Sequence, residues 1–212
     1  MRMSTDKGQQ KNLREAGVLV VQDPTTCTHL AAPAMVRTQK FLCALAVGPV
    51  IVSTAFIDAC IKKGDIPKVN KFLLKDQENE KKFNLKLADA LHRARANKRH
   101  LLRRVPIYCT ADIPNGSDTY KSIVEANGGT FYIYRGRPTI KKTAPEEDEG
   151  PAEPVYLITG QRPDEKILWP KFTQMAQDGN MIPRIVSTEW LLDVAMSQQH
   201  KWSDKYLAVN DK

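Results

Sequence analysis

The sequence predicts an α/β protein built from two copies of one domain, each a small parallel sheet with helices on both faces. Helix-like and strand-like patterns alternate along the 212 residues, as they do when helices connect parallel strands. The segments PVIVSTAF (49–56) and PRIVSTEW (183–190) agree at five of eight positions, and each reads as a strand feeding a helix. We therefore expect two diverged domains, packed head to tail, at 1–80 (first strand truncated) and 105–212, joined by a linker helix at 81–104.

The elements of the first copy follow from its apolar spacing. Phe41, Leu42 and Leu45 recur at helical spacing, and the β-branched run 50–52 reads as a buried strand. Ser53 can cap the following helix. The other expected elements are the end of a strand at 2–5, a helix at 11–16, strands at 18–21 and 28–30, and a helix with Phe56, Ile57, Cys60 and Ile61 on one side that stops at Gly64.

The second copy is expected to repeat this order after a long basic helix at 83–102. Its predicted strands are 105–109, 130–134, 155–158 and the segment starting at 183, and its predicted helices are 118–126, 167–176 and the one starting near Trp190. Residues 139–154 are polar, acidic and rich in proline, which is typical of a mobile loop. Trp190 is expected in the core.

Composition is compatible with an anionic partner. The formal net charge is +8 and the pI about 9.3, although solubility alone can also account for such an excess. The four cysteines lack metal-ligand spacing and lie among apolar residues, as buried free thiols do in a reducing compartment. Neither a membrane span nor a signal peptide is expected.

Catalytic motifs are not found in the sequence. It has no GxSxG element, no glycine-rich nucleotide loop and no clustered pair of carboxylates. The sequence around its four histidines does not indicate that any of them is a base for a cysteine nucleophile. We expect a binding module with no enzymatic activity, no cofactor and no metal.

Three features resemble tandem BRCT domains. They are the strand–Ser/Thr–x–x–Trp–helix element, the Gly128-Gly129 pair, and the linked duplication, with Phe56 in place of the usual tryptophan in the first copy. The segment RTQKFLCAL (37–45) resembles the phosphopeptide-binding segment of the BRCT pairs of checkpoint mediators. The chain also resembles the C-terminal BRCT pair of fungal replication-stress and DNA-damage scaffolds.

The resemblance implies a phosphate pocket in the first copy. In the family, a hydroxyl residue, the backbone N–H of the next residue and a helix lysine bind the phosphate, and these positions fall on Thr5, Asp6 and Lys40. The family usually has glycine at Asp6, so Ser4 is the alternative for Thr5. A hydroxyl, an amide N–H and an ammonium group can satisfy the acceptor oxygens of a phosphoserine.

The resemblance also implies residues that read the peptide beyond its phosphate. Arg37 falls on the position that pairs with a free C-terminal carboxylate three residues after the phosphoserine, and a guanidinium suits a carboxylate better than an ammonium does. Thr38 is expected to steady Lys40. Leu42, Asn115 and Leu192 fall where the family lines the groove between the copies.

The function implied by the resemblance is phosphopeptide binding by a monomer. The expected partner is the DNA-damage-phosphorylated Ser-Gln tail of the 2A core histone, recognised in the nucleus on chromatin by a genome-maintenance scaffold. The alternative is a BRCT pair that binds an unphosphorylated protein or DNA, with weak DNA contact through the basic run 93–104. Lys40 and Arg37 can also be read as an ordinary solvated helix face.

Overall fold

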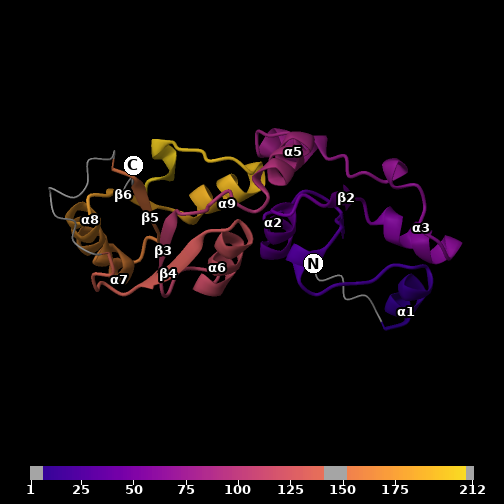
Figure 1. Ribbon diagram of the computed structural model, residues 1–212, viewed down its shortest axis with the longest axis horizontal. Coiled ribbons are helices and arrows are strands. Elements are labelled where there is room, and N and C mark those ends of the chain that lie inside the picture. Colours follow the sequence, from indigo (N-terminus) through magenta and orange to yellow (C-terminus); the bar gives the residue numbers. More distant parts are fainter. Residues whose placement is uncertain (1–6, 141–151, 209–212) are drawn as a thin grey trace.

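The computed structural model describes residues 7–140 and 152–208, which form two units lying side by side along the long axis of the molecule (Figure 1). The first unit contains α1 (Lys7–Glu15), β1 (His29–Ala31), α2 (Gln39–Leu45), β2 (Val50–Val52) and α3 (Ala55–Lys63). The connection between the units contains α4 (Gln77–Lys82) and α5 (Leu87–Asn97). The second unit contains β3 (Pro106–Thr110), α6 (Ser117–Ala126), β4 (Thr130–Tyr134), β5 (Pro154–Ile158), α7 (Pro163–Lys166), α8 (Leu168–Asp178), β6 (Ile182–Val186) and α9 (Thr188–Ser197). No helix among the described residues is long and apolar enough to cross a bilayer.

The second unit is a three-layer α/β domain. Its four strands are all parallel, in the order β4-β3-β5-β6. Successive side chains of a strand point to opposite faces, so Ile107 and Cys109 pack in the same cluster as α6 and α9, whereas Tyr108 packs with α8. Trp190 is fully buried and stacks on Tyr156 at 3.9 Å between ring centroids. The predicted parallel sheet with helices on both faces is confirmed.

The first unit has a smaller parallel sheet. Strand β1 pairs with β2, and Ile51 packs in the cluster that includes α2. Val52 points the other way, into a cluster formed with α1 and α3 that includes Leu13, Phe56 and Cys60. Phe56 therefore occupies a core position like that of Trp190, as the repeat predicts.

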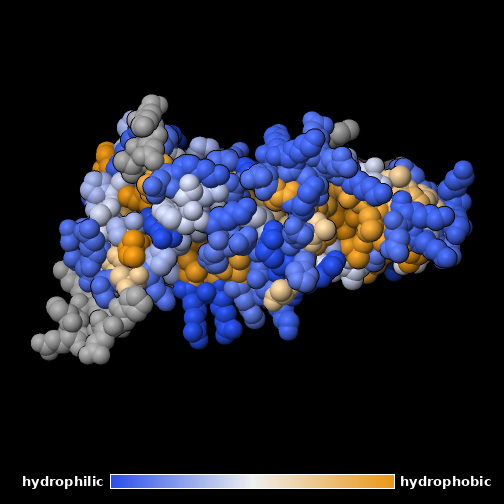
Figure 2. All heavy atoms as spheres, turned by 90° about the horizontal axis from the view of Figure 1, so that it is seen from above, coloured by the Kyte–Doolittle hydropathy of each residue, from blue (hydrophilic) through white to orange (hydrophobic). Residues whose placement is uncertain are grey.

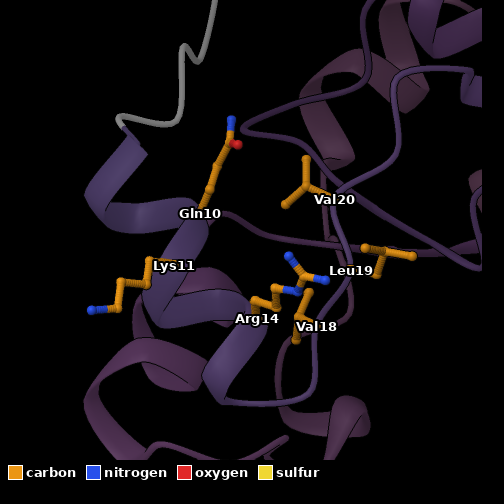
Figure 3. A pocket seen from close by; sticks show the side chains of 6 residues that line it. All are labelled: Gln10, Lys11, Arg14, Val18, Leu19 and Val20. Atoms are coloured by element: carbon orange, nitrogen blue, oxygen red, sulfur yellow. The ribbon is translucent and has the colours of Figure 1, made fainter.

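The predicted strand at 18–21 is wrong. This segment has no regular structure, and the Leu19 side chain is 76% exposed. Among the described residues no strand lies beside it, so its backbone N–H and C=O groups lack the ladder partners that would hold it extended. A shallow cavity of about 260 Å³ separates it from α1 and is lined by Gln10, Lys11, Arg14, Val18, Leu19 and Val20 (Figure 3). Figure 2 shows hydrophobic patches among hydrophilic surface over both halves of the molecule, including the half that holds this unit.

The single long helix predicted at 83–102 is also wrong. The structure has two shorter helices, α4 and α5, separated by Asn84 in the left-handed region at φ 49°. Lys98, at φ 48°, ends α5. Asp76 caps α4 and also accepts a 2.7 Å hydrogen bond from the backbone N–H of Met35. Burial alone would raise the pKa of Asp76, but these hydrogen bonds lower it on balance.

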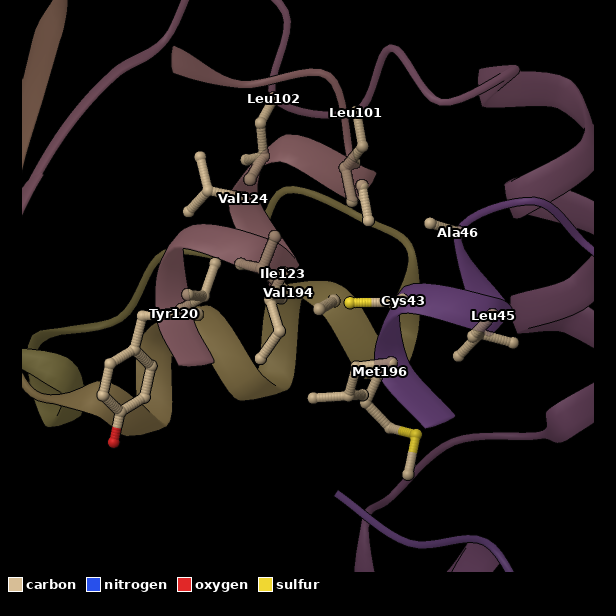
Figure 4. Packing of buried hydrophobic residues seen from close by; sticks show 14 of the residues in the cluster. Cys43, Leu45, Ala46, Leu101, Leu102, Tyr120, Ile123, Val124, Val194 and Met196 are labelled. Carbon is tan, nitrogen blue, oxygen red and sulfur yellow. The ribbon is translucent and has the colours of Figure 1, made fainter. Parts of the chain in front are cut away.

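The two units share one hydrophobic core. Helix α2 of the first unit packs against α6 and α9 of the second, and the buried side chains from all three helices and the linker form one cluster (Figure 4). Cys43 lies at the centre of this contact, where its thiol donates to the backbone carbonyl of Ser122. By position in the repeat, α2 corresponds to α8 and not to α6 or α9. The contact therefore joins unlike elements, which is the predicted head-to-tail packing.

Arginines of the basic linker hold the two units in place. The Nε of Arg93 donates to the last carbonyl of α9 at 2.8 Å, and the Nε of Arg99 donates to the last carbonyl of α6 at 3.1 Å. Arg95 turns the other way and donates to the carbonyl of Gly48, after α2, at 2.9 Å. Cations at helix C-termini are electrostatically favourable. These three members of the run 93–104 therefore act at least partly within the protein.

The glycine pair after α6 lets the linker approach closely. Gly128 has φ 79°, and a Cβ atom there would lie 2.1 Å from the carbonyl oxygen of Arg99. A Cβ on Gly129 would lie 2.9 Å from the Cβ of Leu102. Any larger residue would push the linker away from α6.

The division into 1–80, 81–104 and 105–212 remains a proposal, because α4 runs across its first boundary. A fragment ending at residue 75, before α4, is expected to be unstable because it exposes the apolar face of α2 that α6 and α9 cover. Circular dichroism should show no cooperative thermal transition under conditions in which the full chain melts cooperatively. A soluble fragment with a sharp transition would show that the first unit folds without its partner.

Candidate functional site

The start of α2 is built by a capped turn that leaves one cation in solvent. Thr38 adopts an extended conformation, and its Oγ1 accepts a 3.4 Å hydrogen bond from the N–H of Phe41. Phe41 and Leu42 turn inward and are buried. Lys40 is exposed, and within residues 7–140 and 152–208 it has no hydrogen-bond or ion-pair partner. The helix therefore presents a free ammonium group beside its first turn.

Arg37 lies at the junction of the two units. Its Nη1 is 2.6 Å from Glu189 Oε2, and its Nη2 pairs with Asp193 Oδ1, so α9 supplies both carboxylates. The guanidinium carbon lies 4.8 Å from the ring centroid of Phe83 in the linker. The Arg37 side chain is only 22% exposed, and three side chains, two from α9 and one from the linker, fix its position.

The two carboxylates beside Arg37 differ in how firmly they are held. Asp193 is 19% exposed and also accepts hydrogen bonds from Tyr206, at 2.7 Å, and from Lys205. Burial and the bond to Asp193 raise the pKa of Tyr206. The Glu189 side chain is 59% exposed, and exposed ion pairs contribute only about 0–1 kcal/mol. Glu189 is therefore the more weakly held of the two carboxylates.

Sequence reasoning missed Glu189, Asp193 and Phe83. Asp193 and Arg37 are separated by 156 residues, and no local pattern connects positions so far apart. One signal exists for Glu189: it is one of the three positions at which the repeated octapeptides differ, with Ala55 in the first copy.

The predicted groove residues are placed in three different ways. Leu42 is 0% exposed and packs in the core shared by the two units, beneath the surface between them. Leu192 is half-buried on α9, next to Asp193. Asn115 is exposed in the turn after β3 at φ 69°, and its side chain donates weakly to Tyr120. The predicted phosphate ligands Ser4, Thr5 and Asp6 lie outside the described residues.

The cysteines have the environment of structural thiols. Burial raises the pKa of Cys43 to about 11 and that of Cys109 to about 12. Both thiols are therefore protonated at neutral pH, the opposite of what a nucleophile needs. Among the described residues, no group of three or more histidine, cysteine or acidic side chains is placed to hold a metal ion.

Two parallel-sheet units joined through α2, α6 and α9, with cations at the junction, define a tandem α/β binding module. The chain belongs to the BRCT family: residues 2–74 match the family model described as "Regulator of Ty1 transposition protein 107 BRCT domain". The crystal structure of the BRCT5-BRCT6 domains of S. pombe Brc1 has a TM-score of 0.70 and 28% identity, covering 89% of this chain and 86% of that one.

Further relatives agree with this family. BRCT-containing protein 1 of Schizosaccharomyces pombe is 31% identical over 199 residues, 92% of this chain and 22% of its own length. Human mediator of DNA damage checkpoint protein 1 is 36% identical over 104 residues, 49% of this chain and 5% of its own length. The complex of Rtt107p with the phosphorylated 2A histone has a TM-score of 0.64 and 19% identity, covering 98% of this chain and 88% of that one. The chain spans less than a quarter of these two sequence relatives.

Proposed function

We propose that the chain is a phosphopeptide-binding module that recognises a phosphoserine close to a free C-terminus. The observation that carries the proposal is the pair of cations around Thr38: Lys40, exposed and unpartnered among the described residues, and Arg37, fixed between the two units. A phosphoserine carries about −1.5 to −2 charges, and a terminal carboxylate carries one more. The two cations offer one partner to each of the two anionic groups of such a tail.

Each residue has a distinct role in this proposal. Lys40 binds the phosphate, together with the hydroxyl of Thr5 or Ser4 and the backbone N–H of Asp6. Arg37 binds the carboxylate with its planar fork, and the exposed Glu189 gives way. Asn115 and Leu192, on the second unit, contact the residues between the two anions. Asp193 keeps Arg37 oriented when Glu189 moves.

The proposed partner is the DNA-damage-phosphorylated Ser-Gln tail of the 2A core histone. The solved complex of Rtt107p with the phosphorylated 2A histone, which shares this fold, supports the choice. The relative that is a mediator of the DNA damage checkpoint supports a role in genome maintenance. We infer that the chain, as a non-catalytic monomer, brings a scaffold protein to damaged or stalled chromatin in the nucleus.

Fluorescence polarisation tests the proposal with one labelled histone-tail peptide in two forms. The form phosphorylated on the serine of its Ser-Gln motif should bind with a Kd in the micromolar range, and its unphosphorylated twin should bind at least about tenfold more weakly, a difference of about 1.4 kcal/mol. Equal affinities for the two forms would refute phosphate recognition.

A second candidate function, contact with DNA, is favoured by a basic groove at the far end of the first unit. The groove has a volume of about 640 Å³ and is lined by Ala59, Lys62, Lys63, Pro67, Lys68, Lys71 and Phe72. Among the described residues, none of its four lysines has an ion-pair partner, whereas arginines of the linker bind backbone carbonyls. The groove is therefore a better DNA surface than the run 93–104.

The double variant Lys68→Glu/Lys71→Glu tests this second candidate. If the groove binds DNA, the slope of log affinity against log salt should fall by about one for each phosphate that the variant no longer neutralises. The linker double variant Lys98→Glu/Arg103→Glu is the matched control and should change the slope less. If the linker variant changed the salt slope more than the groove variant, the linker would be the better candidate for DNA contact.

A further inference from the structure

The second unit contains a buried carboxylate held by anion-binding groups. Glu165 is 2% exposed, and its side chain is buried at the carboxyl ends of β3 and β5. Thr110, itself 1% exposed, donates its hydroxyl to Glu165 Oε1 at 2.5 Å. The backbone N–H of Gly160 donates to the same oxygen at 2.9 Å, and the N–H of Arg162 donates to Oε2 at 3.3 Å. The Nε of Arg162 lies 3.7 Å from Oε2.

These donors are of the kinds that bind phosphate. A hydroxyl, two backbone N–H groups and a nearby cation can each make a charge-assisted hydrogen bond to an oxyanion. Gly160 brings its backbone especially close, because a Cβ atom there would lie 2.4 Å from Glu165 Oε2. The contact between Glu165 and Arg162 N also caps α7, but helix capping alone does not require the hydroxyl of Thr110.

The internal repeat explains how the carboxylate reaches this place. Thr110 ends β3, as Thr5 is predicted to end the first strand of the first copy, and Lys171 on α8 corresponds to Lys40 on α2. In the first unit, residues 32–39 lead from β1 to that lysine. In the second unit, the longer connection 159–170 leads from β5 to Lys171. This connection contains α7, which carries Glu165. The extra turn fills the space at the end of β3.

We propose that the second unit contains an oxyanion pocket occupied by its own Glu165, so that the pair accepts a single phosphate, in the first unit. The first part of the proposal, the occupied pocket, is inferred from the contacts of Glu165 alone. The second part, that the pair binds one phosphate, rests on the proposed function. Glu165 thereby sets the specificity of the pair: the second unit reads the peptide but does not take its phosphate.

Chemical rescue of Glu165→Ala tests the occupied pocket. The variant should melt at a lower temperature than wild type, and inorganic phosphate at tenfold excess over its Kd should raise the midpoint by about 3–6 °C relative to chloride at equal ionic strength. Wild type and Glu165→Gln, which keeps the pocket filled, should lack this additional response. Adding Thr110→Val to Glu165→Ala should remove it, because the hydroxyl donor is lost.

Two further measurements keep the proposal falsifiable. If Glu165→Ala does not fold in chloride, refolding from urea should recover the protein in phosphate, and failure in both salts would overturn the pocket, as would equal midpoints in the two salts. Calorimetric titration of wild type with the phosphoserine peptide should give one site per chain, and two sites would overturn the blocking role. Absence of peptide binding would refute the proposed function and leave the phosphate response of Glu165→Ala to decide the pocket.

Discussion

Replacing Lys40 with methionine should abolish detectable binding of the phosphoserine peptide. The ammonium group is exposed and has no partner among the described residues, so in the free protein it is available to a phosphate. Losing one partner of a desolvated charge pair costs about 2–5 kcal/mol, a loss of roughly 30-fold to 5000-fold in affinity. Because methionine is a good helix former and Lys40 packs in no core cluster, the melting temperature should stay close to that of wild type.

The second unit supplies a matched control for this variant. Lys171 is also an exposed lysine at the corresponding position, on α8, and Lys171→Met removes the same charge from the same chain. It should leave peptide affinity within about twofold, roughly 0.4 kcal/mol. If Lys40→Met binds like wild type while folded, or if both variants lose affinity equally, the phosphate pocket is not at the start of α2.

Amidating the C-terminus of the peptide should weaken binding by about 1.5–3 kcal/mol, the range for a hydrogen bond to a charged group. Amidation removes one negative charge and leaves the phosphate untouched. Arg37 is already oriented by Asp193 and Phe83, so little conformational freedom is lost when it meets the carboxylate. The amide and acid forms should be compared by fluorescence polarisation at the same salt concentration.

The variant Arg37→Ala completes a double-mutant cycle with amidation. With the guanidinium gone, Glu189 and Asp193 remain near the peptide terminus, so amidation should no longer weaken binding. Arg37→Lys keeps the charge but not the planar fork, and should recover only part of the effect. Equal losses on amidation in wild type and Arg37→Ala would show that Arg37 does not contact the carboxylate, and an internal phosphorylated motif would become the better ligand.

The sequence was sufficient to predict elements whose stability is local or repeated. The octapeptides at 49–56 and 183–190 become β2 with α3 and β6 with α9 because apolar spacing and β-branching agree there. The predicted cap at Ser53 is wrong, since Thr54 is the N-cap residue of α3 and makes no side-chain capping hydrogen bond. The segment 18–21 has the same β propensity, but a strand also needs a neighbour to pair with, and propensity says nothing about that neighbour. The prediction of one long helix was wrong because Asn84 adopts a left-handed backbone conformation, which the spacing of apolar residues does not indicate.

The candidate site was predictable only in part, for a similar reason. Thr38 and Lys40 lie within one segment, and a resemblance along the sequence can locate both. The carboxylates facing Arg37 come from α9, and the burial of Leu42 comes from α6 and α9, so both depend on how the two units are docked. That docking is a property of packed surfaces and leaves no periodic trace in the sequence.

The linker arginines make the pair of units sensitive to the length of the peptide tail. Arg93 and Arg99 bind the ends of α9 and α6, and Arg95 binds the chain after α2, so α9 is held where its Asp193 orients Arg37, and the span from Lys40 to the Arg37 guanidinium is fixed. One more residue lengthens an extended peptide by about 3.3 Å, which is more than the donor–acceptor distance of a typical hydrogen bond. Under the proposed function, a tail one residue longer or shorter than the fitting one is therefore expected to leave one of its anions without its cation. Selection by length would let the protein distinguish a phosphorylated chain end from the many phosphoserines in the interior of other proteins.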